Sequence, residues 1–249
     1  MRKSFLMSLG AAFGSSLGVA FGAAAGGALA LALGAAAGMA LGVGLAWLLV
    51  PSPSPGPSPS LALVVIARDE ERGLPRAIAS VKDYVNEIVV AVDSRTTDRT
   101  REVAPGAHVF DVTFLDYAQM RTAALRAAKS DWILMLDGDE TLEGDPRPLM
   151  RRRVIWKMAR RHWKDLERRA PAADDRGYPD RQRRLFPNDP RIRFERPVHE
   201  LVEGFPVKSA AYPLIHHFKE ALRPRELLAE RQRLYAEMEG GARSPPSTA

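Results

Sequence analysis

Short, continuous apolar runs recur along the middle of the chain, and each is followed by acidic or polar residues. Runs that are continuous rather than alternating are typical of strands buried on both faces of a parallel sheet. The runs cover Leu61–Ala67, Glu87–Val92, Ala107–Val112 and Trp132–Leu136. The pattern therefore predicts four strands between residues 61 and 136, of which the first, second and fourth are buried.

The segments between these runs have helical patterns. An apolar stripe over residues 74–81, with Pro75 near its start, predicts a first helix. Thr97 or Asp98 can cap a second helix, and residues 117–129 predict a third. Strands and helices in alternation predict the α/β class, with a mostly parallel, doubly wound sheet and right-handed crossovers.

Acidic residues follow three of the predicted strands. Asp69, Asp93 and Asp137 come directly or almost directly after a buried run. Because ligands bind beyond the carboxyl ends of parallel strands, we expect these side chains in one crevice. Asp137-Gly138-Asp139 places two carboxylates around a glycine, which suits a divalent cation that also holds phosphate oxygens. An ordinary acidic turn explains one such position but not three.

Residues 5–50 contain no charged residue and are mostly Ala, Gly and Leu. Glycines at every fourth position from 10 to 26 and from 34 to 42 give a helix a strip of small residues, which lets another helix approach closely. The stretch is roughly twice as long as one membrane crossing requires. We therefore expect a membrane segment over residues 1–50, as a hairpin of two helices rather than one span or a cleaved signal peptide. Arg2 and Lys3 place the N-terminus and the catalytic part on the cytoplasmic side of the cell inner membrane.

Composition divides the rest of the chain. Residues 51–60 read as a Pro/Ser linker, residues 61–235 as a globular domain, and residues 236–249 as a disordered tail. The absence of cysteine excludes disulfides and cysteine-bound metals. Residues 147–169 carry ten Lys and Arg against two acidic residues. We expect a solvated basic helix there, or else contact with anionic lipid or a phosphate-bearing acceptor. Nucleic acid ranks last, because aromatic residues are not interleaved.

Three stretches together resemble the family 2 glycosyltransferases, and within them the inverting lipopolysaccharide-core glucosyltransferase branch. They are Val-Val-Ile-Ala-Arg-Asp-Glu-Glu from residue 64, Glu-Ile-Val-Val-Ala-Val-Asp-Ser from residue 87, and Leu-Met-Leu-Asp-Gly-Asp-Glu from residue 134. The resemblance extends from Leu61 to about Phe218. It implies a GT-A type fold, with a nucleotide-binding half (61–140) and an acceptor half (141–235). It also implies a nucleoside-diphosphate sugar donor and Mg²⁺ or Mn²⁺.

The resemblance further implies a role for individual residues. Those that would bind the nucleotide sugar are Asp69, Glu70, Asp93, Gln119, Arg121, Asp137 and Arg184. The first three would face the base and ribose, and Asp137 would lie near the ribose and the metal. Asp139 would ligate the metal that bridges the diphosphate. Asp69 and Thr122 stand where the family commonly has Asn, which leaves the donor's identity open.

The acceptor half supplies the remaining candidates. His199-Glu200 resembles a His-Glu element of the family, so Glu200 is the first candidate for the base that deprotonates the acceptor hydroxyl, with His199 beside it. Alternatively, Glu200 pairs with an arginine and His199 is a packing or supporting residue. His216 is a candidate third metal ligand or diphosphate contact, since imidazole suits Mn²⁺ better than Mg²⁺. Otherwise it is a packing residue.

The leading hypothesis is a membrane-anchored inverting glycosyltransferase that acts on a lipid-linked or cell-envelope glycan acceptor. A nucleotidyltransferase is a second hypothesis, but it would carry a glycine-rich phosphate loop after the first strand, and residues 68–71 are not one. A catalytically degenerate membrane scaffold is a third. The glycine strip would pack either within one chain or between chains of a homo-oligomer.

Overall fold

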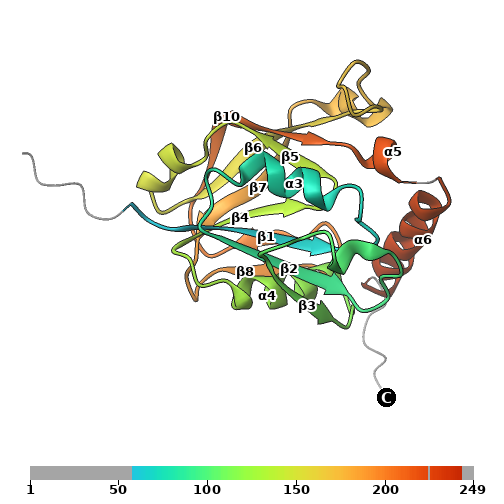
Figure 1. Ribbon diagram of the computed structural model, residues 1–249, viewed down its shortest axis with the longest axis horizontal. Helices are drawn as coiled ribbons and strands as arrows, with labels where there is room; N and C mark the ends of the chain where they lie inside the picture. The colour runs from blue at the N-terminus through green and yellow to red at the C-terminus, as the bar shows by residue number, and fades with distance from the viewer. Residues whose placement is uncertain (1–57, 224, 243–249) are drawn as a thin grey trace, which may run out of the picture. The chain divides into compact units, whose positions relative to one another are not determined.

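The computed structural model of the chain describes residues 58–223 and 225–242 (Figure 1). The predicted membrane segment, most of the predicted linker and residues 243–249 lie outside this described part. Within it, no helix combines the length and the apolar character that a membrane crossing requires.

The four predicted strands form one parallel half-sheet. They are β1 (Leu61–Ala67), β2 (Glu87–Asp93), β3 (His108–Val112) and β4 (Trp132–Asp137). They lie in the order β3-β2-β1-β4, and each neighbouring pair is parallel. All seven residues of β1 are buried, as a continuous apolar run between two helical layers requires. The predicted strands and the parallel sheet are thus confirmed for this half.

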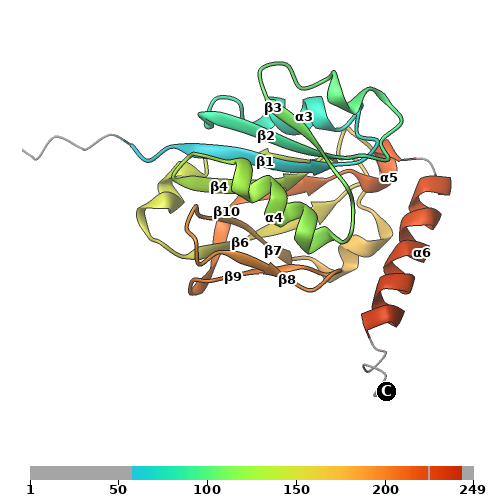
Figure 2. The ribbon, with the colours of Figure 1, turned by 90° about the horizontal axis from the view of Figure 1, so that it is seen from below.

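Two of the three predicted helices are present. Helix α3 (Leu74–Val81) and helix α4 (Tyr117–Ala127) cover opposite faces of the parallel half-sheet (Figures 1 and 2). The helix expected after Asp98 was wrong: only a 3-10 turn, η1 (Arg99–Arg101), forms there, with Asp98 as its cap. Pro105 and Gly106, whose φ is +79°, turn the chain into β3 before a longer helix can develop.

The second half of the chain extends the same sheet. Its strands are β5 (Glu140–Glu143), β6 (Ile155–His162), β7 (Asp180–Pro187) and β10 (Val207–His217), joined by the short turns η2 (Arg147–Arg151) and η3 (Ala173–Gly177). The order continues as β4-β7-β6-β10-β5, with β7 antiparallel to both neighbours and β10 parallel to β6. Strands β8 (Arg193–Glu195) and β9 (Leu201–Glu203) form a separate hairpin pair. The sheet is therefore mixed.

The basic stretch is not the solvated helix that we expected. Strand β6 occupies its centre and is paired on both edges, by β7 and β10. Ile155, Met158 and Ala159 are buried, and the guanidinium of Arg160 reaches inward to Glu140 Oε1 at 2.9 Å. Glu140, which comes from another strand, thus neutralises Arg160 and allows the charged segment β6 to lie within the sheet.

The chain closes with helices α5 (Lys219–Leu222) and α6 (Arg225–Ala242). In Figure 1, α6 lies across the end of the sheet toward which the β1 arrow points. It is tied there by an ion pair between Arg68 and Glu230 (2.8 Å) and by stacking of Tyr235 on Tyr117, with ring centroids 5.2 Å apart. The helix runs past residue 236, where we expected the disordered tail to begin.

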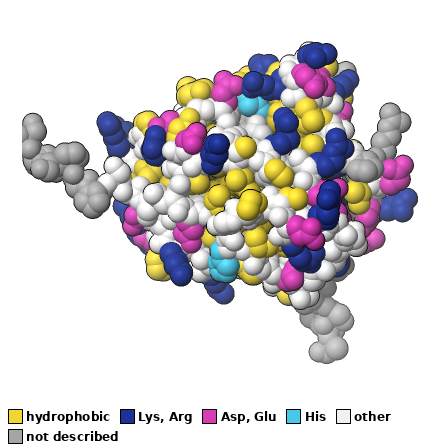
Figure 3. Space-filling model, in the orientation of Figure 1, with side chains coloured by type: hydrophobic (Ala, Val, Ile, Leu, Met, Phe, Trp, Pro, Cys, Tyr) yellow, Lys and Arg dark blue, Asp and Glu magenta, His cyan; other side chains and the backbone are white. Residues whose placement is uncertain are grey.

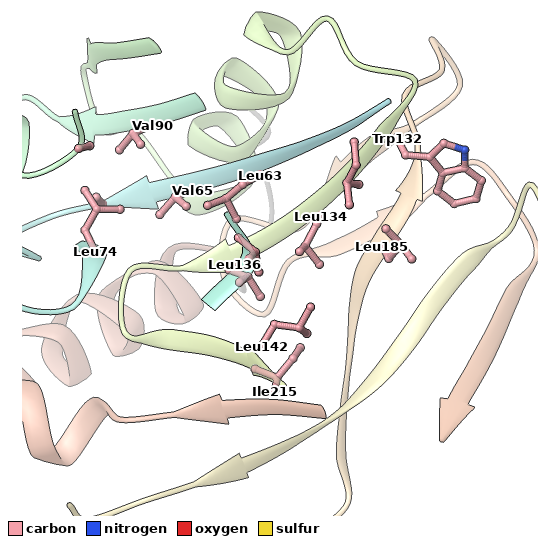
Figure 4. Packing of buried hydrophobic residues seen from close by; sticks show 14 of the residues in the cluster. Leu63, Val65, Leu74, Val90, Trp132, Leu134, Leu136, Leu142, Leu185 and Ile215 are labelled. Carbon is pink, nitrogen blue, oxygen red and sulfur yellow. The ribbon is translucent and has the colours of Figure 1, made fainter. Parts of the chain in front are cut away.

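One hydrophobic core joins the two halves. Figure 4 shows Leu63, Leu134 and Leu136 of β1 and β4 in the same cluster as Leu142 of β5 and Ile215 of β10. Full burial of a leucine or isoleucine stabilises the fold by about 1.5–3 kcal/mol relative to exposure. The β4–β5 turn at residues 138–139 is therefore held between two strands that are both anchored in this core.

Candidate active site

A cavity of about 680 Å³ opens at the carboxyl ends of β1, β2 and β4 and is bordered by α6. Its size is that of a site for a nucleotide or a drug-sized ligand. Among the predicted residues, those that line it are Glu70, Asp93, Arg121, Asp137, Asp139 and His199. Figure 3 shows acidic and basic side chains side by side at the end of the molecule where α5 and α6 lie. Of the three strand-end carboxylates expected in one crevice, Asp93 and Asp137 line this cavity and Asp69 does not.

Asp137 lies between two buried arginines. Its Oδ1 accepts from Arg121 Nη2 at 2.7 Å, and its Oδ2 accepts from Arg184 Nη2 at 2.8 Å. Burial alone would raise the pKa of Asp137, but the two guanidinium groups outweigh burial and hold it well below its usual range. Arg184 also binds Glu140 at 2.8 Å, and Arg121 also binds Glu200. Both oxygens of Asp137 are thus already engaged.

Asp139 is 2% exposed and is held differently. Its Oδ2 lies 2.9 Å from Arg223 Nη2 and 3.4 Å from His217 Nε2, yet it has no hydrogen-bond partner among the described residues. Burial opposes ionisation, but the charge of Arg223 and the neighbouring imidazole of His217 lower the pKa of Asp139 below its usual range. An ionised, buried oxygen without a hydrogen bond beside an imidazole nitrogen has the character of a metal ligand.

Glu70 shares Arg223 with Asp139. It is 3% exposed and forms an ion pair with Arg223, and burial, which outweighs that pair, raises the pKa of Glu70 to about 8. Its side chain lies against two glycines: a Cβ on Gly138 would come within 2.7 Å of Glu70 Cγ, and a Cβ on Gly73 within 2.4 Å of the Gly138 carbonyl oxygen. The loops after β1 and β4 can approach this closely only because both residues are glycine.

Three predicted donor-binding residues have mainly local partners. Asp69, at φ +52°, accepts from the backbone N–H of Thr97 at 2.8 Å and so fixes the loop after β1. Asp93 lines the cavity and pairs with Arg95 at 2.6 Å. Gln119 donates to Asp116 at 2.7 Å and faces a separate groove beside α4. Gln119 therefore lies apart from the cavity that Arg121 lines.

The structure separates Glu200 from His199. Glu200 binds Arg121, which connects it to Asp137, as the alternative interpretation of this residue anticipated. His199, at φ +52°, is exposed, bonds to Glu239 of α6 at 2.9 Å and stacks on Tyr235 at 5.8 Å between centroids. Its contacts are therefore with the helix that borders the cavity.

The structure places His217, and not the predicted His216, beside Asp139. Successive strand residues point to opposite faces, so only one of the two histidines can face the cavity. His216 instead accepts from Trp163 Nε1 at 3.0 Å and lies 3.0 Å from Glu143. His217 lines the cavity. The sequence contains the His-His pair, but the register of β10 decides between its members.

Several cavity residues had no signal in the sequence. They are Arg160, His162, Arg223, Arg231 and Tyr235. Arg223 lies in the irregular segment after α5. It is 153 positions from Glu70 in the sequence, and only the fold brings the two side chains together. His162 ends a strand that composition predicted as a helix.

The residues present fit a divalent cation that is completed by its substrate. No group of three His, Asp or Glu side chains gathers into a ready metal site within residues 58–223 and 225–242. Asp139 and His217 offer two ligands, and Mg²⁺ or Mn²⁺ is commonly held by one or two protein ligands together with substrate phosphates and water. The chemistry of this donor set suits such an ion at the edge where a diphosphate would lie.

Comparison with known proteins finds a family similarity in the first half of the described chain. Residues 62–151 match the model of the family described as Glycosyl transferase family 2. That stretch contains β1 to β4 with Glu70, Asp93, Asp137 and Asp139. Over these residues the chain is therefore similar to glycosyltransferase family 2, in agreement with the resemblance found in the sequence.

Individual relatives cover less of the chain. A TPR repeat-containing protein of Synechococcus elongatus is 39% identical over 142 residues, which are 56% of this chain and 34% of that protein. An uncharacterized glycosyltransferase of Rickettsia bellii is 40% identical over 80 residues, 31% of this chain and 27% of that protein. The chain thus spans about a third or less of the length of these curated relatives.

Solved structures are more distant. Glucosyl-3-phosphoglycerate synthase from Mycobacterium tuberculosis, crystallised with Mn²⁺, uridine diphosphate and phosphoglyceric acid, is 21% identical to this chain. The match covers 42% of this chain and 43% of the synthase, with a TM-score of 0.35. At that score the likeness supports no conclusion about the ligands of this chain.

Proposed function

We propose that this chain is a metal-dependent, inverting glycosyltransferase that transfers a sugar from a nucleoside-diphosphate sugar to a hydroxyl group. The observation that supports this most directly is the Asp139 carboxylate. It is buried and ionised, lies between His217 and its single guanidinium partner Arg223, and faces a cavity of nucleotide-sugar size. It also belongs to the stretch that matches the glycosyltransferase family.

The residues have distinct roles in this proposal. Glu70 and Asp93 line the part of the cavity at β1 and β2 and contact the nucleotide. Asp139 and His217 would hold Mg²⁺ or Mn²⁺, and such an ion would supply positive charge to stabilise a diphosphate leaving group. Asp137 does not offer a free oxygen, because Arg121 and Arg184 occupy both, so its role is to fix these arginines at the site.

Glu200 is the proposed base. An inverting transfer requires one carboxylate to take the proton of the acceptor hydroxyl as that oxygen attacks the sugar. Arg121 binds both Glu200 and Asp137. One arginine therefore holds the proposed base in a fixed position relative to Asp137. Glu200→Gln should lower the turnover of acceptor while leaving donor binding intact.

The proposal also extends to where the enzyme works and on what. The uncharged stretch 5–50 and its four-residue glycine period support attachment to the inner membrane, with the catalytic part in the cytoplasm. A lipid-linked or cell-envelope glycan, as in the lipopolysaccharide-core branch, is then the expected acceptor. A reporter fused at position 55 tests the hairpin: activity on the far side of the membrane would contradict it.

The central experiment is donor hydrolysis with a panel of nucleotide sugars, with and without Mn²⁺. We expect metal-dependent release of nucleoside diphosphate, with a loss of at least about 100-fold in Asp139→Ala, because leaving-group stabilisation is a dominant catalytic effect. Asp145→Ala, a surface carboxylate paired with Arg147, is the matched control and should retain activity. Full activity in Asp139→Ala would contradict the metal assignment. Pyrophosphate release from nucleoside triphosphates would favour a nucleotidyltransferase, and absence of donor binding would favour a scaffold.

A further inference from the structure

A pair of buried histidines lies behind the proposed metal ligand. Strands β6 and β10 are parallel neighbours, and their register sets His162 opposite His217. The two Nδ1 atoms are 2.9 Å apart, and the rings meet at 75° with centroids 4.8 Å apart. Both side chains line the cavity and are less than 10% exposed. We propose that His162 is a positioning residue that fixes the tautomer of His217 and thereby the affinity of Asp139 and His217 for the metal. This inference rests on the proposed metal-dependent function.

The two histidines share one proton. Two Nδ1 atoms at hydrogen-bond distance hold one proton between them, so one nitrogen donates and the other accepts. A metal at His217 needs a lone pair on Nε2, the atom that lies 3.4 Å from Asp139 Oδ2. The proton of His217 must then sit on Nδ1 and point to His162. His162 therefore accepts at Nδ1 and carries its own proton on Nε2.

Asp180 is placed to receive that second proton. Its Oδ2 lies 3.2 Å from His162 Nε2. The carboxylate is itself fixed by Arg160, at 2.6 Å, and by Gln182, at 2.6 Å. The chain Asp180–His162–His217 thus has a direction, from the carboxylate to the free nitrogen that faces Asp139. Partners of this kind typically change metal affinity 10–100-fold when they are removed.

A second carboxylate opposes this direction. Asp174 Oδ2 lies 3.3 Å from His162 Nδ1, where it favours a proton on the wrong nitrogen. Asp174 is the more exposed of the two acids, and its partner Lys219 is 3.3 Å away. Asp180, with its two shorter bonds, is the better held. Asp174 and Asp180 therefore have the same charge and similar distances to His162, but opposite effects on the tautomer of His217.

These two acids give a matched test. In the full chain, the Kd for Mn²⁺ alone is measured from the electron paramagnetic resonance signal of free Mn²⁺. We expect Asp180→Asn to weaken binding about 10-fold or more, because the amide can donate to His162 Nε2 and reverse the chain. Asp174→Asn should leave binding unchanged or tighten it. A simple loss of negative charge near the metal would weaken both.

Substitutions of His162 provide the second readout. His162→Phe keeps the ring but removes the acceptor, and we expect it to weaken Mn²⁺ binding about as much as Asp180→Asn does. His162→Asn restores an acceptor near the Nδ1 position and should recover part of the affinity. Equal weakening by Asp174→Asn and Asp180→Asn, or a wild-type Kd in folded His162→Phe, would overturn the role of His162 but leave the proposed metal-dependent function standing. Wild-type binding that is no stronger than in Asp139→Ala would overturn the proposed metal role and this inference with it.

Discussion

The ion-pair chain through Arg121 allows a quantitative test of how the site is held. Arg121 is 5% exposed and bridges Asp137 and Glu200, two carboxylates that come from different halves of the chain. Arg121→Met keeps the packing of the side-chain stem but removes the charge. Breaking a buried pair by removing one partner costs roughly 3–5 kcal/mol, because the other partner stays buried and uncompensated. Asp137 retains Arg184 at 2.8 Å, so Glu200 alone loses its partner, and we expect the lower end, about 3 kcal/mol.

The assay is urea unfolding of the full chain, followed by tryptophan fluorescence. Glu200→Gln in the Arg121→Met background removes the stranded charge and should recover part of the loss, with a coupling of about 1–3 kcal/mol in a double-mutant cycle. Arg126→Met, an exposed arginine on the same helix, is the matched control and should change stability by less than about 0.5 kcal/mol. A cost below about 1 kcal/mol for Arg121→Met, or strict additivity in the cycle, would refute the reasoning.

Three further predictions concern the cavity. Since burial raises the pKa of Glu70 to about 8, the native state binds the extra proton between about pH 4.5 and 8, so the free energy of unfolding should fall as pH rises through that window, and Glu70→Gln should remove this slope. Gly138→Ala should cost about 1–3 kcal/mol in thermal unfolding, because its methyl meets Glu70 at 2.7 Å, whereas Gly177→Ala, with nothing within 4 Å, should cost much less. Tyr235→Ala loses its stacking on Tyr117 and should speed proteolysis within α6 while the rest of the chain stays protected; unchanged cleavage would show that the stack does not hold the helix.

The sequence predicts the parallel half of the sheet well because its signal is local. A continuous apolar run such as Leu61–Ala67 is buried on both faces whatever follows it, and the residues at its end must lie at the sheet edge. Strand β6 carries no such signal. Its arginines and lysine are compatible with a solvated helix until β7, β10 and Glu140 are in place, and all three are distant in sequence. Tertiary pairing overrides local composition there.

In the candidate site, too, residues with a local sequence signal could be predicted and residues placed by tertiary contacts could not. The carboxylates could be predicted because strand ends in a parallel sheet converge, and the sequence shows where strands end. Their counter-charges could be predicted only in part. The family resemblance points to Arg121 and Arg184 as site residues but not to their pairing with Asp137, and Arg223, 84 positions after Asp139, has no signal in the sequence. The choice between His216 and His217 depends on strand register, which shifts in β10 between its pairings at Ser209 and Leu214. One residue of slip exchanges the two histidines.

The separation of acids from arginines also has a consequence for the order of synthesis. The ribosome delivers Glu70 and Asp139 well before Arg223, which pairs with both, and it delivers Asp137 before Arg184, the second of its two arginines. Until those residues emerge, the nascent sheet edge carries like charges that cannot be buried together, which is costly in a low-dielectric interior. The stretch 62–151 therefore has its strands and Arg121 but lacks Arg184 and Arg223, which complete the charge pairing at its edge. The last 60 or so residues complete the folding of the first half as well as covering it.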